Sequence, residues 1–304
     1  MNRTLRVVTA TLCTLLLYAA IAWIPGLAQT SFDRLWERSA AAGDDPSAFY
    51  GTNNDTRNLA YGAVADGEGS VVERIFVTTG GNDPYEIHVL RADNGNEVGT
   101  LPGVEQLPTP SDGRKVTDVA VSDDGIIIAC NEVNNSFTAD GATENFRCWR
   151  WDSLTDSPTQ IIDYTPPDQD GDGEGDWLGR QFTVVGSAAA GDLTLLVAGT
   201  RSSVNVYRFT TSDNGQSFSA EVLTRDSRPP SGNINGVAPE GPGQSPFVVN
   251  VLNVAPLRYD ASGSEVAEDQ GAFPAFSHSL KYFEIGARSF YATFRWDTSG
   301  ENQV

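Results

Sequence analysis

Short runs of apolar residues recur along most of the chain, with turn residues between them. Continuous runs such as Ile75–Val77 and Leu195–Val197 are typical of strands that are buried on both faces. Other runs, such as Gly62–Ala65, are rich in small residues. Turn sequences such as Asp93-Asn94-Gly95 and Asp213-Asn214-Gly215 follow, in which glycine supplies positive φ and Asx side chains bond their own turns. The pattern predicts an all-β chain.

One arginine context is repeated along this pattern. The repeated residues are Arg91, Arg150, Arg208, Arg258 and Arg295, separated by 59, 58, 50 and 37 residues. Repeats of this length suit four-stranded propeller blades with loops of unequal length. The small-residue runs then fit the innermost strands, which converge on the propeller axis. The sequence therefore predicts a β-propeller with about five four-stranded blades visible.

The propeller domain is predicted to cover residues 58–304. Its blades are assigned to residues 58–102, 114–165, 181–225, 233–268 and 274–304. The fifth unit stops just after Gly300, where a fourth strand is expected. Two explanations stay open: Phe32–Ser39, in the N-terminal segment 29–57, supplies the outer strand and closes the ring, or the chain is a fragment of a longer propeller.

Residues 1–28 have the features of a secretory signal. Arg3 and Arg6 precede an uncharged run from Val7 to Ile24, and small residues lie at Gly26 and Ala28. An uncleaved membrane anchor is the alternative, because the run is nearly long enough to span a bilayer. We expect an exported protein that is extracellular, on the cell surface or periplasmic, with no membrane attachment after cleavage.

The chain is strongly acidic, with a formal net charge of −20 at pH 7. Such a surface repels phosphate backbones and anionic lipid headgroups, so nucleic acids and acidic membranes are not expected as partners.

Cys130 and Cys148 are the cysteines that remain after removal of the signal. A hairpin centred near residue 139 places them opposite each other on neighbouring strands, and exported proteins favour disulfides. We expect a Cys130–Cys148 disulfide, and two buried free thiols are the alternative.

An acidic stretch resembles the first half of a calcium-binding loop. Asp168, Asp170 and Asp172 alternate before Gly173, and Asp176 takes the ninth place. The twelfth place is Gly179, where a bidentate glutamate belongs. Two interpretations stay open: calcium as a cofactor completed by a carboxylate from elsewhere, or a solvated acidic loop.

Strand order places the long polar connections, 79–85, 131–145 and 165–179, on one propeller face. Rigid folds commonly build binding sites from such loops. Asn131, Asn135 and Trp177 are the candidate ligand contacts on this face, with Trp177 able to stack on a sugar.

Catalytic signals are weak by comparison. His88 and His278 are more typical of packed or exposed residues than of ligands, and neither a Gly-x-Ser-x-Gly sequence nor a cysteine pair with zinc spacing occurs.

Two resemblances to known families follow from short stretches. Leu35–Ser39 with Thr56–Gly62, Asp118–Asn131 and Phe182–Gly186 resemble uncharacterised secreted bacterial β-propeller proteins, known by a domain of unknown function. This resemblance implies a propeller and brings no activity. Thr211–Phe218 is similar to the Asp-box of sialidase-type propellers, where it is a structural hairpin remote from the chemistry.

We therefore expect a non-enzymatic exported binding or scaffold module with a protein or carbohydrate partner. The alternative is a propeller-type hydrolase, either a glycosidase or a metal-dependent lactonase. A carboxylate pair for glycoside hydrolysis is compatible with the many aspartates, although no spacing singles one pair out.

Overall fold

The computed structural model describes residues 56–79, 85–111, 113–133, 144–167, 176–200, 203–225, 234–251, 256–268, 277–285 and 288–295. The chain divides into two units, Met1–Glu37 and Arg38–Val304, and all the described residues belong to the second. They form β-strands and one short 3₁₀ helix, η1 (Val104–Gln106), with no α-helix among them. Nowhere in these ranges is a helix long and apolar enough to cross a membrane.

Four antiparallel sheets have four strands each, hydrogen-bonded in chain order, and a fifth sheet has two strands. The first sheet contains β1 (Thr56–Ala65), β2 (Val71–Thr79), β3 (Glu86–Arg91) and β4 (Glu97–Thr100). The second contains β5 (Gly113–Val121), β6 (Ile127–Val133), β7 (Phe146–Trp151) and β8 (Thr159–Tyr164). The third contains β9 (Phe182–Val185), β10 (Thr194–Ala198), β11 (Asn205–Thr210) and β12 (Ser219–Thr224). The fourth contains β13 (Ile234–Pro239), β14 (Phe247–Val251), β15 (Leu257–Tyr259) and β16 (Glu265–Glu268), and the fifth contains β17 (Ser277–Ile285) and β18 (Arg288–Arg295).

The first four predicted blades are confirmed as sheets, with ends within two residues of the predicted ones. The fifth prediction was partly wrong. In sheets one to four the repeated arginine lies in the third strand, whereas Arg295 ends β18, the second strand of its sheet. Among the described residues, two strands lie between β15 and β18, whereas three lie between β11 and β15, which agrees with the short separation of 37 residues between Arg258 and Arg295.

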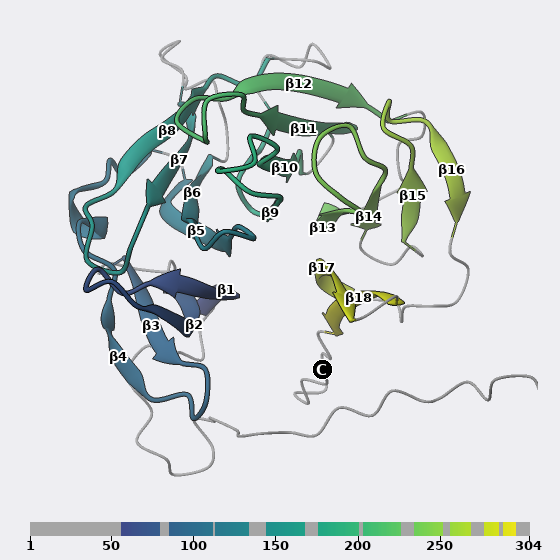
Figure 1. Ribbon diagram of the computed structural model, residues 1–304. Helices are drawn as coiled ribbons and strands as arrows, with labels where there is room; N and C mark the ends of the chain where they lie inside the picture. The colour runs from purple at the N-terminus through teal and green to yellow at the C-terminus, as the bar shows by residue number, and fades with distance from the viewer. Residues whose placement is uncertain are drawn as a thin grey trace, which may run out of the picture. The chain divides into compact units, whose positions relative to one another are not determined.

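Consecutive sheets pack face to face through apolar side chains, and their first strands are neighbours (Figure 1). Phe76 and Val89 of the first sheet meet Val119 and Trp151 of the second in one core cluster. The small residues predicted for the first strands are needed at this contact. A β-carbon at Gly62 would overlap the side chain of Val121, so the approach of β1 to β5 requires glycine there. The arrangement is propeller-like.

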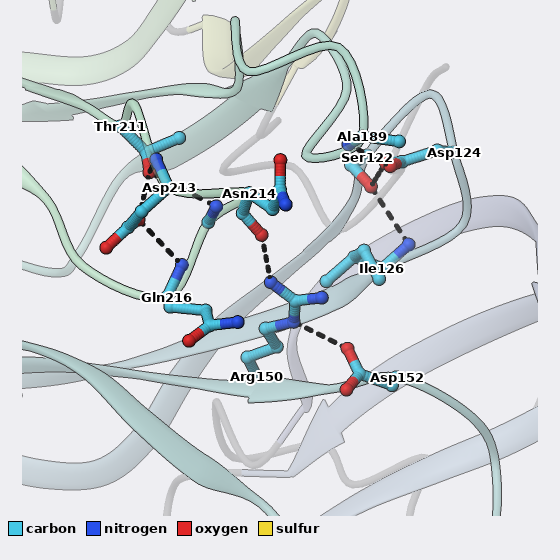
Figure 2. A network of polar contacts seen from close by, with 11 residues as sticks. Ser122, Asp124, Ile126, Arg150, Asp152, Ala189, Thr211, Asp213, Asn214 and Gln216 are labelled. Atoms are coloured by element: carbon cyan, nitrogen blue, oxygen red, sulfur yellow. Dashed lines mark hydrogen bonds and ion pairs between the residues drawn. The ribbon is translucent and has the colours of Figure 1, made fainter.

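Two of the repeated arginines, Arg150 and Arg208, bind the next sheet, whereas Arg258 binds Glu240 of its own sheet. In Figure 2, Arg150 binds Asp152 through Nε at 2.5 Å and donates from Nη1 to the Asn214 carbonyl of the third sheet, also at 2.5 Å. One repeat later, Arg208 donates to the Ala261 carbonyl of the fourth sheet at 3.0 Å. Arg91 differs, because its guanidinium binds only Asp93 within its own turn.

The turn that resembles an Asp-box, between β11 and β12, is built around one carboxylate. Asp213 accepts hydrogen bonds from the backbone N–H groups of Gln216 and Ser217 at 3.1 and 2.9 Å. Asn214 and Gly215 have φ angles of 57° and 75°, which glycine and asparagine tolerate best. These bonds, led by the Ser217 hydroxyl, hold the pKa of Asp213 well below its usual range. The turn is therefore held by hydrogen bonds within its own residues.

Candidate functional site

Strand direction divides the connections of the four-stranded sheets between two sides. The first-to-second and third-to-fourth turns lie on one side, here called the short-turn side. The second-to-third connections and those between sheets lie on the other, the long-connection side. The connections that the sequence identified as long, after β2, β6 and β8, all belong to the long-connection side.

Polar groups on the short-turn side are used to join sheets. Asp124, in the β5–β6 turn, accepts from the Ser122 hydroxyl at 2.6 Å and from the Ala189 N–H of the third sheet at 2.9 Å (Figure 2). The Asp123 N–H donates to the Gly186 carbonyl, again between the second and third sheets. These groups therefore serve the fold.

On the long-connection side, residues 176–178 form a strap between the second and third sheets. Trp177 is paired with Thr200, whose N–H donates to the Trp177 carbonyl at 2.9 Å. Leu178 is paired with Val133 through two backbone hydrogen bonds of 2.9 and 3.1 Å. The backbone on both sides of the half-buried Trp177 indole is thus fixed, which places a preformed aromatic surface at this side.

Asp176 anchors the start of this strap and is buried. Its Oδ2 accepts from Ser203 Oγ at 2.7 Å, from Asn205 Nδ2 at 2.8 Å and from the Tyr207 hydroxyl. Burial, followed by the charge of Asp176, raises the pKa of Tyr207 far above its usual range, so the phenol keeps its proton and donates it. Three donors on one oxygen give Asp176 a structural role in holding the strap, and calcium binding by Asp176 stays a prediction.

The other calcium candidates, Asp168, Asp170 and Asp172, lie outside the described residues, as does Asn135. Within the described part of the chain, no group of three or more His, Cys, Asp and Glu side chains is arranged to hold a metal ion.

Asn131 was expected to face a ligand, and the structure corrects this. The residue is fully buried at the end of β6. Its Nδ2 donates to the Asn145 carbonyl at 2.9 Å, and its Oδ1 accepts from the Arg147 N–H at 2.7 Å. The side chain therefore bridges β6 to the start of β7, because a buried amide must satisfy both of its ends.

A carboxylate that the sequence analysis did not single out lies among the first strands. Asp118, in β5, is fully buried, and its Oδ2 accepts from the Phe182 N–H of β9 at 3.0 Å. Lys281, in β17, donates from Nζ to the carbonyl of the same Phe182 at 3.3 Å. Since β10 pairs with the other edge of β9, Asp118 and Lys281 provide hydrogen-bond partners for the backbone N–H and carbonyl of Phe182 on its unpaired edge.

Burial raises the pKa of Asp118 from 3.8 to about 6, even though the positive charge of Lys281 and two backbone donors oppose the shift. A buried carboxylate with a raised pKa is a candidate functional residue, in addition to its structural contacts. The signal was present in the sequence. Asp118 is a charged residue inside the run Val116–Val121, which is otherwise typical of an inner strand.

Cys130 and Cys148 occupy the register that the sequence predicted. They are directly opposite each other in the β6–β7 ladder, and both are fully buried. The structure contains them as free thiols, so the expected disulfide is not part of it. Cys130 Sγ instead lies 3.6 Å from the Gly179 carbonyl oxygen, beneath the strap.

The histidines have structural surroundings as far as they are described. His88 is buried in β3, with Nδ1 2.6 Å from Glu97 Oε1 and Nε2 3.3 Å from Glu86 Oε2. His278 lies in β17, and its side chain is outside the description.

No protein-family profile and no curated protein matches the chain. Among solved structures, it is similar to a DUF4623 family protein from Bacteroides eggerthii, with 13% identity, a TM-score of 0.55 and coverage of 79% of this chain and 50% of that one. The chain thus spans half the length of that protein. A protein of unknown function from Dyadobacter fermentans matches with 11% identity and a TM-score of 0.47, covering 79% and 75% of the two chains. A GH43_1 enzyme from Xanthomonas citri complexed with xylose matches with 8% identity and a TM-score of 0.45, covering 82% and 89%.

At such identities the first similarity shows the fold alone. That neighbour is itself named for an uncharacterised domain.

Proposed function

We propose that the protein is an exported binding or scaffold module that contacts its partner through the long-connection side. The observation that supports this is the strap at residues 176–178, where Trp177 pairs with Thr200 of the third sheet and the adjacent Leu178 pairs with Val133 of the second. A fixed aromatic surface binds with little loss of conformational entropy, and indole faces stack well on sugars and apolar groups. The polar groups of the short-turn side are, by contrast, engaged in joining sheets.

The export of the protein belongs to the same proposal. Residues 1–28 serve as a cleaved secretory signal, and the mature protein is extracellular, on the cell surface or periplasmic. The acidic chain, with a formal net charge of −20, favours a neutral or cationic partner surface, and a neutral carbohydrate or a protein fits this requirement.

The five sheets are proposed to be blades of a propeller ring. The exposed face of the first sheet supports this. Leu59 and Tyr61 on β1 are 60% and 58% exposed, whereas Ala60 and Val64 on the same strand are buried against the second sheet. In a complete ring another blade covers such a face. Leu59→Glu tests whether this face is covered, because the substitution destabilises the protein only where another segment packs on Leu59.

Calcium binding stays part of the proposal, with Asp168, Asp170, Asp172 and Asp176 as the candidate ligands. Alternating aspartates in a glycine-rich loop supply hard oxygen ligands, and Asp176 also binds Ser203, Asn205 and Tyr207.

One observation favours the alternative function, a propeller-type hydrolase. Asp118 has a pKa raised to about 6 by burial, in the range that suits a general acid. Glycoside hydrolysis needs a second carboxylate within about 5–10 Å. Turnover of glycoside or lactone substrates that is lost in Asp118→Asn would establish the hydrolase in place of the binding module.

The binding proposal is tested by screening the purified protein against soluble polysaccharides and extracellular proteins, followed by calorimetry on each hit. Trp177→Ala is expected to weaken binding at least tenfold while the melting temperature changes little. Arg91→Ala is the matched control, because it removes a long exposed side chain on the short-turn side. Equal affinities of the wild type and Trp177→Ala, or a loss confined to Arg91→Ala, would contradict the proposed contact side.

A further inference from the structure

The two free cysteines form a directly opposed pair in a ladder that is buried between two sheets. We propose that Cys130 and Cys148 are an oxidative modification site. They form a cross-strand disulfide by thiol–disulfide exchange before the third sheet packs on the second. Once the sheets are packed, the two cysteines keep the redox state in which the protein folded.

The ladder places the two residues directly opposite each other, which is the arrangement that a cross-strand disulfide requires. Cys130 pairs with Cys148, and the neighbouring pair Ala129 with Trp149 continues the same register. Opposed residues in antiparallel strands have Cα atoms about 4.5–5.5 Å apart. Disulfides span Cα separations of about 4.4–6.8 Å, so the pair meets this requirement.

Packing closes the site to reagents once the sheets have assembled. Both cysteines are fully buried in the core cluster shared by the second and third sheets, which includes Phe146 and Phe182. Cys130 Sγ also contacts the Gly179 carbonyl under the strap. An exchange reagent therefore reaches neither thiol in the folded protein.

Chemistry adds to this steric protection. The thiolate is the species that attacks a disulfide. Burial raises the pKa of both thiols well above the usual range, and the charge of Asp118, the ladder partner of Cys130, raises them further. Hardly any thiolate is present in the folded protein at neutral pH, so exchange is confined to chains in which the β6–β7 hairpin is still uncovered.

The exchange balances with a small-molecule disulfide such as oxidised glutathione. The thiolate of one cysteine attacks a glutathione sulfur and releases one reduced glutathione, leaving a mixed disulfide on the protein. The thiolate of the second cysteine attacks the protein sulfur of this mixed disulfide and releases the second reduced glutathione. The protein loses two electrons and two protons, and the two glutathione molecules gain them.

The bond also fastens the base of one long connection. Residues 131–147, which the disulfide would close into a loop, begin at Asn131 and contain the candidate contact Asn135. The bond depends on the ladder alone, so it is independent of the ligand.

The test compares two orders of folding and oxidation in the full chain, with Cys13→Ser in every sample so that only this pair reacts. One sample is refolded from urea in a mixture of oxidised and reduced glutathione. The other is refolded in reductant, freed of it and then placed in the same glutathione mixture. Both are unfolded, alkylated without reductant and digested with trypsin.

The first sample is expected to contain Cys148–Arg150 linked to Val116–Arg147, with no alkylated cysteine, and to lose the link on reduction. The second is expected to contain two alkylated cysteines after hours of exposure. In Cys148→Ser, Cys130 ends as an alkylated thiol or a glutathione adduct and never as a protein cross-link. Two alkylated cysteines in the first sample would overturn the disulfide, and a linked pair in the second would overturn the protection by packing.

Discussion

Replacing Asp118 with asparagine is expected to remove a pH dependence of stability that this one carboxylate causes. The pKa of Asp118 is 3.8 in the unfolded chain and about 6 in the folded protein, where burial is the main cause. The folded state therefore binds the proton more tightly. The stabilisation from protonating Asp118 is complete below pH 3.8 and is lost as the pH rises through about 6.

The size of the effect follows from the shift. Each pKa unit corresponds to about 1.4 kcal/mol, so a shift of about two units makes the wild type lose about 3 kcal/mol of unfolding free energy between about pH 4 and pH 7 through Asp118. In Asp118→Asn this contribution is absent. The attraction between ionised Asp118 and Lys281 is already included in this shift, because it opposes the effect of burial on the pKa of Asp118.

The assay is urea unfolding of both proteins, followed by tryptophan fluorescence, at several pH values between about 4 and 7. Subtracting the two unfolding free energies at each pH cancels the other carboxylates, whose opposite shifts affect both proteins alike. The difference, wild type minus Asp118→Asn, is expected to fall by about 3 kcal/mol as the pH rises. A constant difference would show that Asp118 is not desolvated in the folded protein. A rising one would show that attraction to Lys281 outweighs burial.

Two further substitutions test the scaffold. Arg150→Met removes a charged hydrogen bond to the third sheet and is expected to lower the free energy of unfolding in urea by about 2 kcal/mol. Arg91→Met, at the equivalent position of the first sheet, is expected to change stability little. Equal losses in the two variants would contradict the role of Arg150 between sheets. Asp176→Asn is expected to lower the free energy of unfolding by about 2 kcal/mol, equally in calcium and in chelator, because Asp176 binds protein donors. Asp170→Asn is expected to leave the melting temperature in chelator unchanged and to abolish the rise that calcium causes. A calcium dependence of the Asp176→Asn loss would identify Asp176 as a ligand.

Periodicity predicted most of the fold, because the strand pattern is a local property. The runs around Ile75 and Leu195 became second strands buried on both faces, and the small residues around Gly62 became an inner strand. The fifth unit was misassigned because the arginine was taken to mark the third strand, although it marks a position at a strand end that faces the turns. The separations within the repeat contained the information needed to correct it.

The site was harder to predict, because its chemistry depends on contacts between distant segments. The ladder of Cys130 and Cys148 followed from hairpin symmetry, which is local. The burial of Asn131 and the commitment of Asp176 to Tyr207 depend on how residues 176–178 lie across two sheets, and no spacing in the sequence encodes that. Polar residues at the ends of strands look alike in sequence whether they bind a ligand or the neighbouring sheet.

The two sides of the sheets differ in how their polar groups are satisfied, and this difference limits where a partner can bind. On the short-turn side, Arg150 and Asp124 bind neighbouring turns, and Asp213 is bonded within its own turn. A partner there would have to break such bonds before making new ones, at a cost comparable to the gain. On the long-connection side, buried groups such as Asp176 and Asn131 are satisfied beneath the surface, which leaves the half-buried Trp177 above a scaffold that needs no rearrangement. Contact at Trp177 leaves the buried hydrogen bonds of Asp176 and Asn131 in place, so the case for Trp177 rests on the fixed backbone of the strap.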